Sequence, residues 1–141
     1  MIFDELTAQF YGAFDNRAGK PNVSVLRTLF IPKGLIVKCG AGAPEIYDLE
    51  SFISPREGLL TDGTLTDFYE QEVSARTEIA GSIATRWSLY RKSGILAHIA
   101  FEATGIKTMQ LVRTETGWKF SSVAWEDERD GFDVEAAWPP R

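Results

Sequence analysis

The chain has 141 residues, of which 44% are hydrophobic and 25% are charged, and its formal net charge is −5 at pH 7. This length suits a single domain over residues 1–141 that buries enough apolar surface to fold without added cross-links. Cys39 is the one cysteine, which excludes an internal disulfide.

The charge pattern also argues against several kinds of partner. A negative chain without a lysine- or arginine-rich stretch is a poor match for nucleic acid. The first residues are acidic rather than basic, and no apolar run is long enough to span a bilayer. We therefore expect a cytoplasmic protein that binds neither nucleic acid nor a membrane.

Helical periodicity marks the beginning of the chain. Apolar residues recur three and four positions apart from Phe3 to Phe14, which predicts one amphipathic helix. A short second helix is expected after Asn22, and Pro32 is expected to end it.

The next segment predicts a strand and then a third helix. The strand is expected over residues 35–39, and a loop rich in glycine and alanine follows it. Asp48 is placed to cap the helix. Ser54 and Pro55 resemble a second helix start, so we expect the helix to restart there.

After Thr66 the apolar period changes to two, which is typical of strands. Hairpin-linked strands are predicted over residues 68–79, 83–90, 106–113 and 118–125. Residues 95–101 are compatible with either a strand extension or a short helix.

The last predicted strand carries apolar residues at both parities. Trp118, Phe120 and Ala124 share one parity, whereas Val123 and Trp125 share the other. A sheet with one solvated face alternates more cleanly than this. One face is therefore expected to meet the helices, and the other to meet a second subunit or the sheet itself through curvature.

Three segments together carry a family resemblance, namely Trp87–Tyr90, Gly105–Leu111 and Gly117–Glu128. They resemble the Trp-Ser-x-Tyr, Gly-Ile-Asn-Ser-x-Gln-Leu and Trp-x-Ile-x-Ser-x-x-Trp strands of a bacterial branch of the nuclear transport factor 2-like superfamily. Residues 68–72 resemble the Phe-x-Glu-x-Glu element of the same branch.

The resemblance covers nearly the whole chain, with Lys107 in place of the usual Asn and Phe120 in place of the usual Ile. It implies the α+β class and a cystatin-like cone, in which a curved antiparallel sheet wraps around helices and leaves a pocket. It also implies a homodimer through the outer sheet face. The superfamily includes isomerases, dehydratases, cyclases and transport adaptors, so the fold does not decide the function.

The candidate acid–base residues are Glu70, Glu72 and His98. Glu70, Glu72 and Arg76 share one strand face by parity, where a carboxylate could be a buried base or part of a solvated Glu–Arg ladder. The opposite parity, which includes Val73, is the expected core face. His98 is the only histidine, so metal binding is not expected, and a base or a surface position remain alternatives.

Aromatic residues and one amide are the candidate ligand-binding residues: Tyr11, Phe14, Trp87, Tyr90, Gln110 and Trp125. Such side chains can stack on a flat ligand and orient it with one or two hydrogen bonds. Core or dimer packing is the alternative for each tryptophan. Trp87 and Tyr90 differ in parity, so all six cannot share one face in a simple register.

No cofactor or metal is expected. Gly40–Gly42 lack the third glycine of a dinucleotide loop, and the acidic residues of 126–130 lack calcium-loop spacing and are interpreted as a solvated end. We expect a domain that binds a small hydrophobic molecule. The alternatives are an acid–base enzyme (isomerase, dehydratase or cyclase) and a structural dimerisation module whose cavity its own side chains fill.

Overall fold

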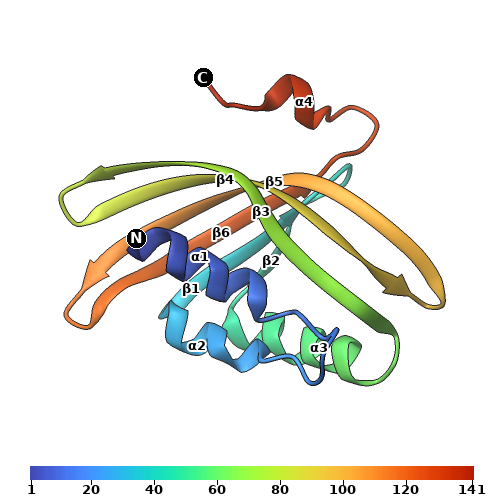
Figure 1. The fold of residues 1–141 in the computed structure, drawn as a ribbon. Helices are drawn as coiled ribbons and strands as arrows, with labels where there is room; N and C mark the ends of the chain where they lie inside the picture. Colours follow the sequence, from blue (N-terminus) through green and yellow to red (C-terminus); the bar gives the residue numbers. More distant parts are fainter.

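The computed structural model describes all of residues 1–141. Three helical segments lie on one side of a curved sheet, and a short helix lies on the other (Figure 1). The helices are α1 (Ile2–Gly12), η1 (Val23–Val25) with α2 (Leu26–Leu29), α3 (Leu49–Thr61) and α4 (Val134–Ala137). None of them combines the length and apolar character that crossing a bilayer requires.

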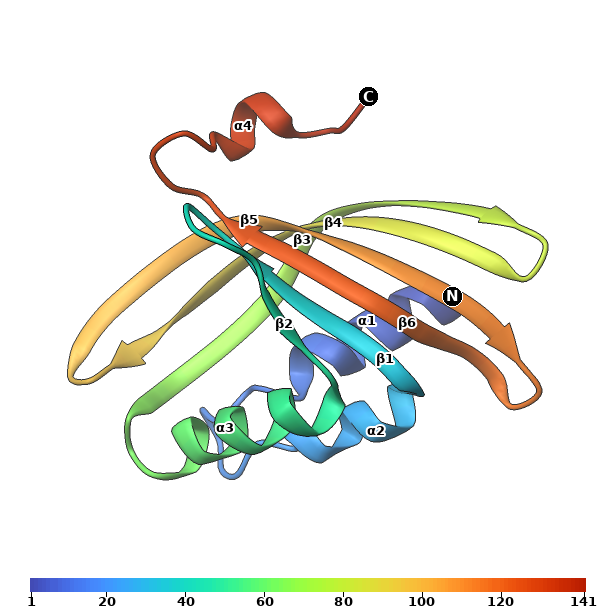
Figure 2. The same cartoon turned by 180° about the vertical axis from the view of Figure 1, so that it is seen from behind.

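The sheet has six strands in the order β2-β1-β6-β5-β4-β3. They are β1 (Phe30–Cys39), β2 (Glu45–Tyr47), β3 (Leu65–Ala80), β4 (Ile83–Leu96), β5 (Ile99–Thr114) and β6 (Gly117–Asp127). Neighbouring strands are antiparallel except β1 and β6, which run parallel (Figure 2). The predicted α+β architecture, with helices inside a curved and mostly antiparallel sheet, is confirmed.

The prediction that Pro32 ends the second helix is wrong. The helix ends at Leu29, and Pro32 lies inside β1. The pairing of β1 with β6 shifts register between Phe30 and Leu35. Pro32 therefore lies where the hydrogen-bond ladder is interrupted, and a backbone N–H is not needed at this position.

The cap of α3 is confirmed, but the predicted restart is wrong. Asp48 accepts a hydrogen bond from the Ser51 backbone, and α3 then continues through Pro55 without interruption. Phe52 and Leu60 are buried on either side of the proline. This packing outweighs the single backbone hydrogen bond that the proline removes.

The segment 95–101 is a strand extension rather than a helix. β4 and β5 continue to a tight hairpin whose turn residues, Ala97 and His98, have φ values of 48° and 70°. The long hairpin arms extend the sheet beyond α3 and form part of the wall described below.

A bulge in β6 explains the mixed parity of the last strand. Gln110 pairs with Ser122, whereas the next residue, Leu111, pairs with Phe120. The extra residue reverses the parity, so Phe120, Val123 and the flanking tryptophans all lie on the inner face, toward the helices. This strand is therefore not apolar on both faces, and the expectation of two apolar faces is corrected here.

The main core lies between the inner face of the sheet and helices α1 to α3. Phe10 is at its centre, with its ring 5.6 Å from Phe14 and 5.7 Å from Phe120 between centroids. On the outer face, α4 lies over β5, where Val134 is buried. Part of this face is thus covered by the carboxyl-terminal segment of the same chain (Figure 1).

Candidate functional site

The space between the sheet, α1 and α3 contains a cavity of about 400 Å³. Eleven of its seventeen lining residues are hydrophobic, and six of those are aromatic: Phe10, Phe14, Phe52, Phe68, Phe101 and Trp125. All of the other lining residues are charged: Lys38, Arg56, Glu70, Lys92, Lys107 and Asp127. An apolar chamber with a few charged groups is the usual composition of a small-molecule site.

Strand register explains why these charges meet. Lys107 on β5 lies opposite Trp125 on β6, and Lys38 on β1 lies opposite the same tryptophan from the other side. On the other half of the sheet, Glu70 on β3 lies opposite Lys92 on β4. Residues paired across strands share a face, so all five side chains point toward the helices.

Lys107 forms the buried floor of the cavity. Its ammonium nitrogen lies 3.0 Å from a Glu70 carboxylate oxygen, and only 4% of the lysine side chain is exposed. The same nitrogen lies 3.9 Å from the centroid of the Tyr90 ring and 5.2 Å from that of Trp125. Burial lowers the pKa of Lys107 below its ordinary value, although the charge of Glu70 opposes that effect.

A second charged group lies beside the first. The Tyr90 hydroxyl donates a hydrogen bond to Asp127, and Lys92 lies 2.8 Å from the other oxygen of that carboxylate. Burial and the charge of Asp127 raise the pKa of Tyr90. Burial alone would raise the pKa of Asp127, but Lys92 and the tyrosine outweigh it, and the pKa lies below the ordinary value. The carboxylate is therefore ionised and the phenol neutral at pH 7.

Gly105 makes room for this arrangement. It lies between Tyr90 and Asp127 in the ladder, and a Cβ at this position would overlap the Tyr90 hydroxyl and the Glu126 carbonyl. Only glycine leaves the phenol space to reach the carboxylate. The glycine that opens the family-like segment on β5 thus has a packing role at the site.

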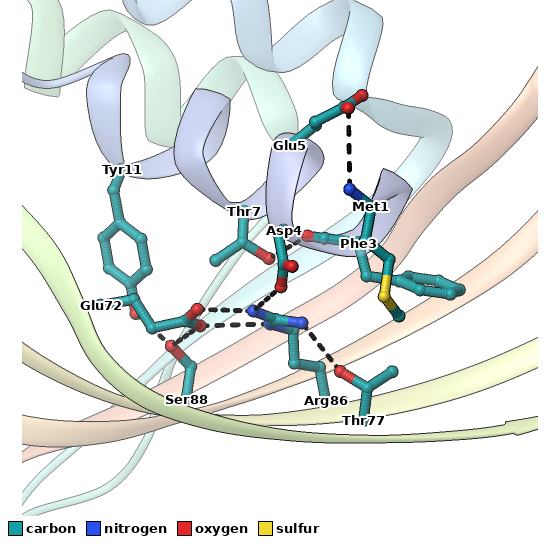
Figure 3. A network of polar contacts seen from close by, with 10 residues as sticks. All are labelled: Met1, Phe3, Asp4, Glu5, Thr7, Tyr11, Glu72, Thr77, Arg86 and Ser88. Atoms are coloured by element: carbon teal, nitrogen blue, oxygen red, sulfur yellow. Dashed lines mark hydrogen bonds and ion pairs between the residues drawn. The ribbon is translucent and has the colours of Figure 1, made fainter.

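A separate polar network joins α1 to the sheet (Figure 3). The Arg86 guanidinium donates to Glu72 at 2.5 Å, to Thr77 at 2.8 Å and to Asp4 on α1 at 2.9 Å. Ser88 donates to Glu72 at 2.6 Å and also lies 2.8 Å from the hydroxyl oxygen of Tyr11. Glu72 is therefore fully engaged in a structural network and does not line the cavity.

The structure brings only some of the predicted site residues together. Phe14, Glu70 and Trp125 line the cavity. Tyr11 and Tyr90 lie behind its floor, with ring centroids 5.3 Å and 3.9 Å from the Lys107 nitrogen. The burial of Tyr11 raises the pKa of its phenol well above the ordinary value, so it is a neutral hydrogen-bonding group.

Three other candidates lie away from the cavity. Trp87 pairs with Arg76 and Thr108 on the outer face, between inward-pointing neighbours. Gln110 is exposed on the same outer face, where it accepts a hydrogen bond from Thr85. His98 is exposed at the tip of the β4–β5 hairpin. None of these candidate positions can contact a molecule inside the cavity.

The expected faces of β3 are corrected by a second bulge. Glu72 pairs with Tyr90, but the next paired residue is Ser74, so Val73 is the extra residue. Glu70 and Glu72 consequently point inward, whereas Arg76 points outward and donates to the Pro140 carbonyl at 2.6 Å. Val73, expected in the core, is 56% exposed.

Sequence reasoning missed most of the charged lining. In the sequence, Lys107 stands out only as a departure from the family pattern, and Asp127 belongs to an acidic run that predicts a solvated end. A signal for Lys107 existed, because it shares its parity with the apolar Met109 and Leu111 on a strand that faces the core. For Asp127, the signal was its even spacing from Trp125 on the same strand.

No group of three or more histidine, cysteine, aspartate or glutamate side chains converges to hold a metal ion. Four of the six charged residues of the cavity instead form two lysine–carboxylate pairs, which suit hydrogen bonding, ion pairing and proton transfer.

No protein-family model matches the sequence, and no curated protein matches it. Solved structures do share its fold. A nuclear transport factor 2-like superfamily protein from Salmonella enterica Typhimurium LT2 is 13% identical with a TM-score of 0.74, over 91% of this chain and 89% of its own. A nuclear transport factor 2-like protein with a cystatin-like fold, from Novosphingobium aromaticivorans, is 16% identical with a TM-score of 0.73, over 99% and 87%.

A third neighbour is a proposed aromatic ring hydroxylase, also from Novosphingobium aromaticivorans. It is 14% identical with a TM-score of 0.72, and 92% of each chain is covered. At these identities the likeness concerns the fold alone. The chain has the nuclear transport factor 2-like, cystatin-like fold, which confirms the fold that its strand motifs imply.

Proposed function

We propose that this protein binds a small molecule with an aromatic or apolar body in the cavity between the sheet and α3. The observation that carries the proposal is an aromatic-walled chamber of about 400 Å³ whose floor is the buried ammonium of Lys107. This volume lies within the range of about 300–1,000 Å³ typical of small-molecule pockets. The ligand's flat part would lie against Phe52 and Trp125, whose own rings are in edge-to-face contact with centroids 5.9 Å apart.

The cavity of about 400 Å³ also supports this proposal over a purely structural module. In such a module we expected the protein's own side chains to fill the interior. The proposed aromatic ring hydroxylase among the structural neighbours lends support, because a fold neighbour is named for action on aromatic rings. Its chemistry is not carried over, since fold alone does not determine function.

A fluorescence titration tests the proposal. N-phenyl-1-naphthylamine is neutral and becomes fluorescent in apolar pockets, so we expect saturable binding with one site per chain. Ala103 lines the cavity, and Ala103→Trp should fill it and abolish the signal. The matched control is Ala100→Trp on the same strand, at an exposed position. Absence of saturable binding to the wild type, or equal binding by both variants, would contradict the proposal.

A second function, acid–base catalysis, is favoured by one specific observation. Glu70 and Lys107 form a carboxylate–ammonium pair that lines an apolar chamber. The carboxylate could remove a proton next to a carbonyl group, while the ammonium stabilises the enolate oxygen that forms. Glu72 and His98, the other candidate bases, do not line the cavity.

Exchange of carbon-bound hydrogen tests this second function. The enzyme should catalyse deuterium uptake from D2O at the α-carbon of 1-tetralone, a ketone with an aromatic body, as followed by NMR. Glu70→Gln should abolish the uptake. The control, Glu102→Gln, removes an exposed carboxylate on β5 and should leave the rate unchanged. Equal rates in the wild type and Glu70→Gln would show that the cavity does not catalyse proton abstraction by this residue.

A further inference from the structure

The charges that line the cavity do not cancel. Of six charged residues, Lys107 is paired with Glu70 and Lys92 with Asp127, at 3.0 Å and 2.8 Å. Two cations remain. Neither the Lys38 ammonium nor the Arg56 guanidinium has a carboxylate oxygen within 4.0 Å. The cavity therefore carries an excess of two positive charges in a chain whose net charge is −5.

These two cations come from different elements and lie nearer to solvent than the pairs at the floor. Lys38 projects from β1 beside Trp125 and is exposed. Arg56 projects from the second turn of α3 and is half-buried, with its guanidinium carbon 4.8 Å from the centroid of the Phe52 ring. The excess charge thus lies at the solvent side of the chamber, and the aromatic walls lie behind it.

We infer that the ligand is an aromatic carboxylate, which enters ring first and leaves its carboxylate at Lys38 and Arg56. The inference rests on the proposed function and specifies the ligand class of the same cavity. A ring displaces water from Phe52 and Trp125, and the carboxylate pairs with both free cations. A guanidinium offers a planar fork that matches a carboxylate. A cationic ligand would instead meet two like charges that form no ion pair, since Glu45, opposite Lys38 on β2, accepts a hydrogen bond from the Tyr47 hydroxyl.

A matched pair of ligands tests the charge preference. 2-Naphthoate and 2-naphthamide have nearly the same shape and differ in charge, and each is measured by its displacement of bound N-phenyl-1-naphthylamine. Partly exposed ion pairs are modest, so two of them favour the carboxylate by about tenfold. The preference should shrink as the salt concentration rises, because salt screens charges near the surface.

Variants show whether the two named residues cause that preference. Lys38→Gln combined with Arg56→Gln should equalise the two ligands. Lys33→Gln combined with Lys20→Gln makes the same change in net charge at exposed residues outside the cavity lining, and should preserve the tenfold difference.

Failure of the inference is distinguishable from failure of the proposed function. If N-phenyl-1-naphthylamine binds but the wild type binds 2-naphthoate and 2-naphthamide with equal affinity, the inferred charge selection is wrong and the cavity remains a ligand site. The inference is likewise overturned if the control variant loses the preference as fully as the cavity variant does, because general charge would then explain it. If the fluorescent probe does not bind at all, the proposed function itself fails.

Discussion

Lys107 is the residue on which the inner site most depends. Its ammonium and the Glu70 carboxylate are nearly buried, with 4% and 10% of their side chains exposed. Removing two charges from water is costly, and their mutual attraction offsets the cost only while both are present. The pair is consequently a poor source of stability but a strong constraint on where a polar ligand atom can lie.

Replacing one member of the Lys107–Glu70 pair should destabilise the protein far more than replacing both. Lys107→Met leaves Glu70 as an unpaired buried carboxylate and should lower the free energy of unfolding by about 3–5 kcal/mol. Adding Glu70→Gln should restore most of that loss. Urea denaturation of the two single variants and the double variant measures both effects. Strictly additive losses would show that the two side chains do not interact.

Asp127 should make the free energy of unfolding depend on pH in the acid range. Its folded pKa lies below its ordinary value, because Lys92 and Tyr90 favour the ionised form. Its contribution is therefore complete above the unfolded pKa of about 3.9 and is lost as the pH falls through the lower folded pKa. Below about pH 4, the stability advantage of the wild type over Asp127→Asn should shrink. An advantage that stays constant from pH 6 to pH 2.5 would contradict this assignment.

At the scale of elements, the contact of α1 with the sheet is fixed by polar as well as apolar groups (Figure 3). Arg86 has only 4% of its side chain exposed, and it joins Glu72 on β3 to Asp4 on α1. Asp4 is 64% exposed, so the two ion pairs of this arginine differ strongly in their environment.

This difference predicts unequal effects for two variants of the same network. Arg86→Met leaves the Glu72 carboxylate without its ion-pair partner and should lower the free energy of unfolding by about 3–5 kcal/mol. Asp4→Asn removes an exposed partner and should cost less than about 1 kcal/mol. Thermal and urea unfolding of both variants provide the comparison. Similar losses from the two variants would mean that the position of α1, rather than the buried charge, is what the arginine maintains.

The elements themselves were largely predictable from the sequence, but the faces of their strands were not. Local signals identified the Asp48 cap and the hairpin strands, since period and capping depend on near neighbours. The bulges at Val73 and in β6 reversed parity after a single residue and left no clear sequence signal. The bulge at Val73 explains why Glu72 and Arg76 lie on opposite faces although their even spacing predicts one face.

The same limit applies to the candidate site. Glu70 and Trp125 were identified because acids and large aromatics are recognised chemical types. Lys92 and Asp127 were missed, because their pairing joins β4 to β6 across an intervening strand. Contacts of this kind depend on register between distant segments, which a single sequence does not specify.

At the scale of the whole molecule, the outer face of the sheet is shared between solvent and the chain's own end. The segment after β6 crosses this face, where the Pro140 carbonyl accepts a hydrogen bond from Arg76 on β3 at 2.6 Å and Val134 is buried. The homodimer implied by the sequence resemblance remains a proposal for this face. A second copy approaching it would meet the carboxyl-terminal segment first.

Removal of that segment should therefore promote self-association. Deleting residues 131–141 removes α4 from the outer face of β5 and the carbonyl that Arg76 contacts, and so leaves this part of the face free. Sedimentation equilibrium should show a larger average mass for the shortened chain than for the full chain at the same concentration. An unchanged or smaller mass would mean that the segment does not compete with a second copy and instead supports any assembly.

A crystal structure grown with 2-naphthoate tests most directly whether the cavity accepts an aromatic acid. We predict density for the ring against Phe52 or Trp125, inside the cavity, with the carboxylate within hydrogen-bonding distance of Arg56 or Lys38. A chamber closed by its own side chains, or naphthoate bound only elsewhere on the molecule, would contradict the central claim.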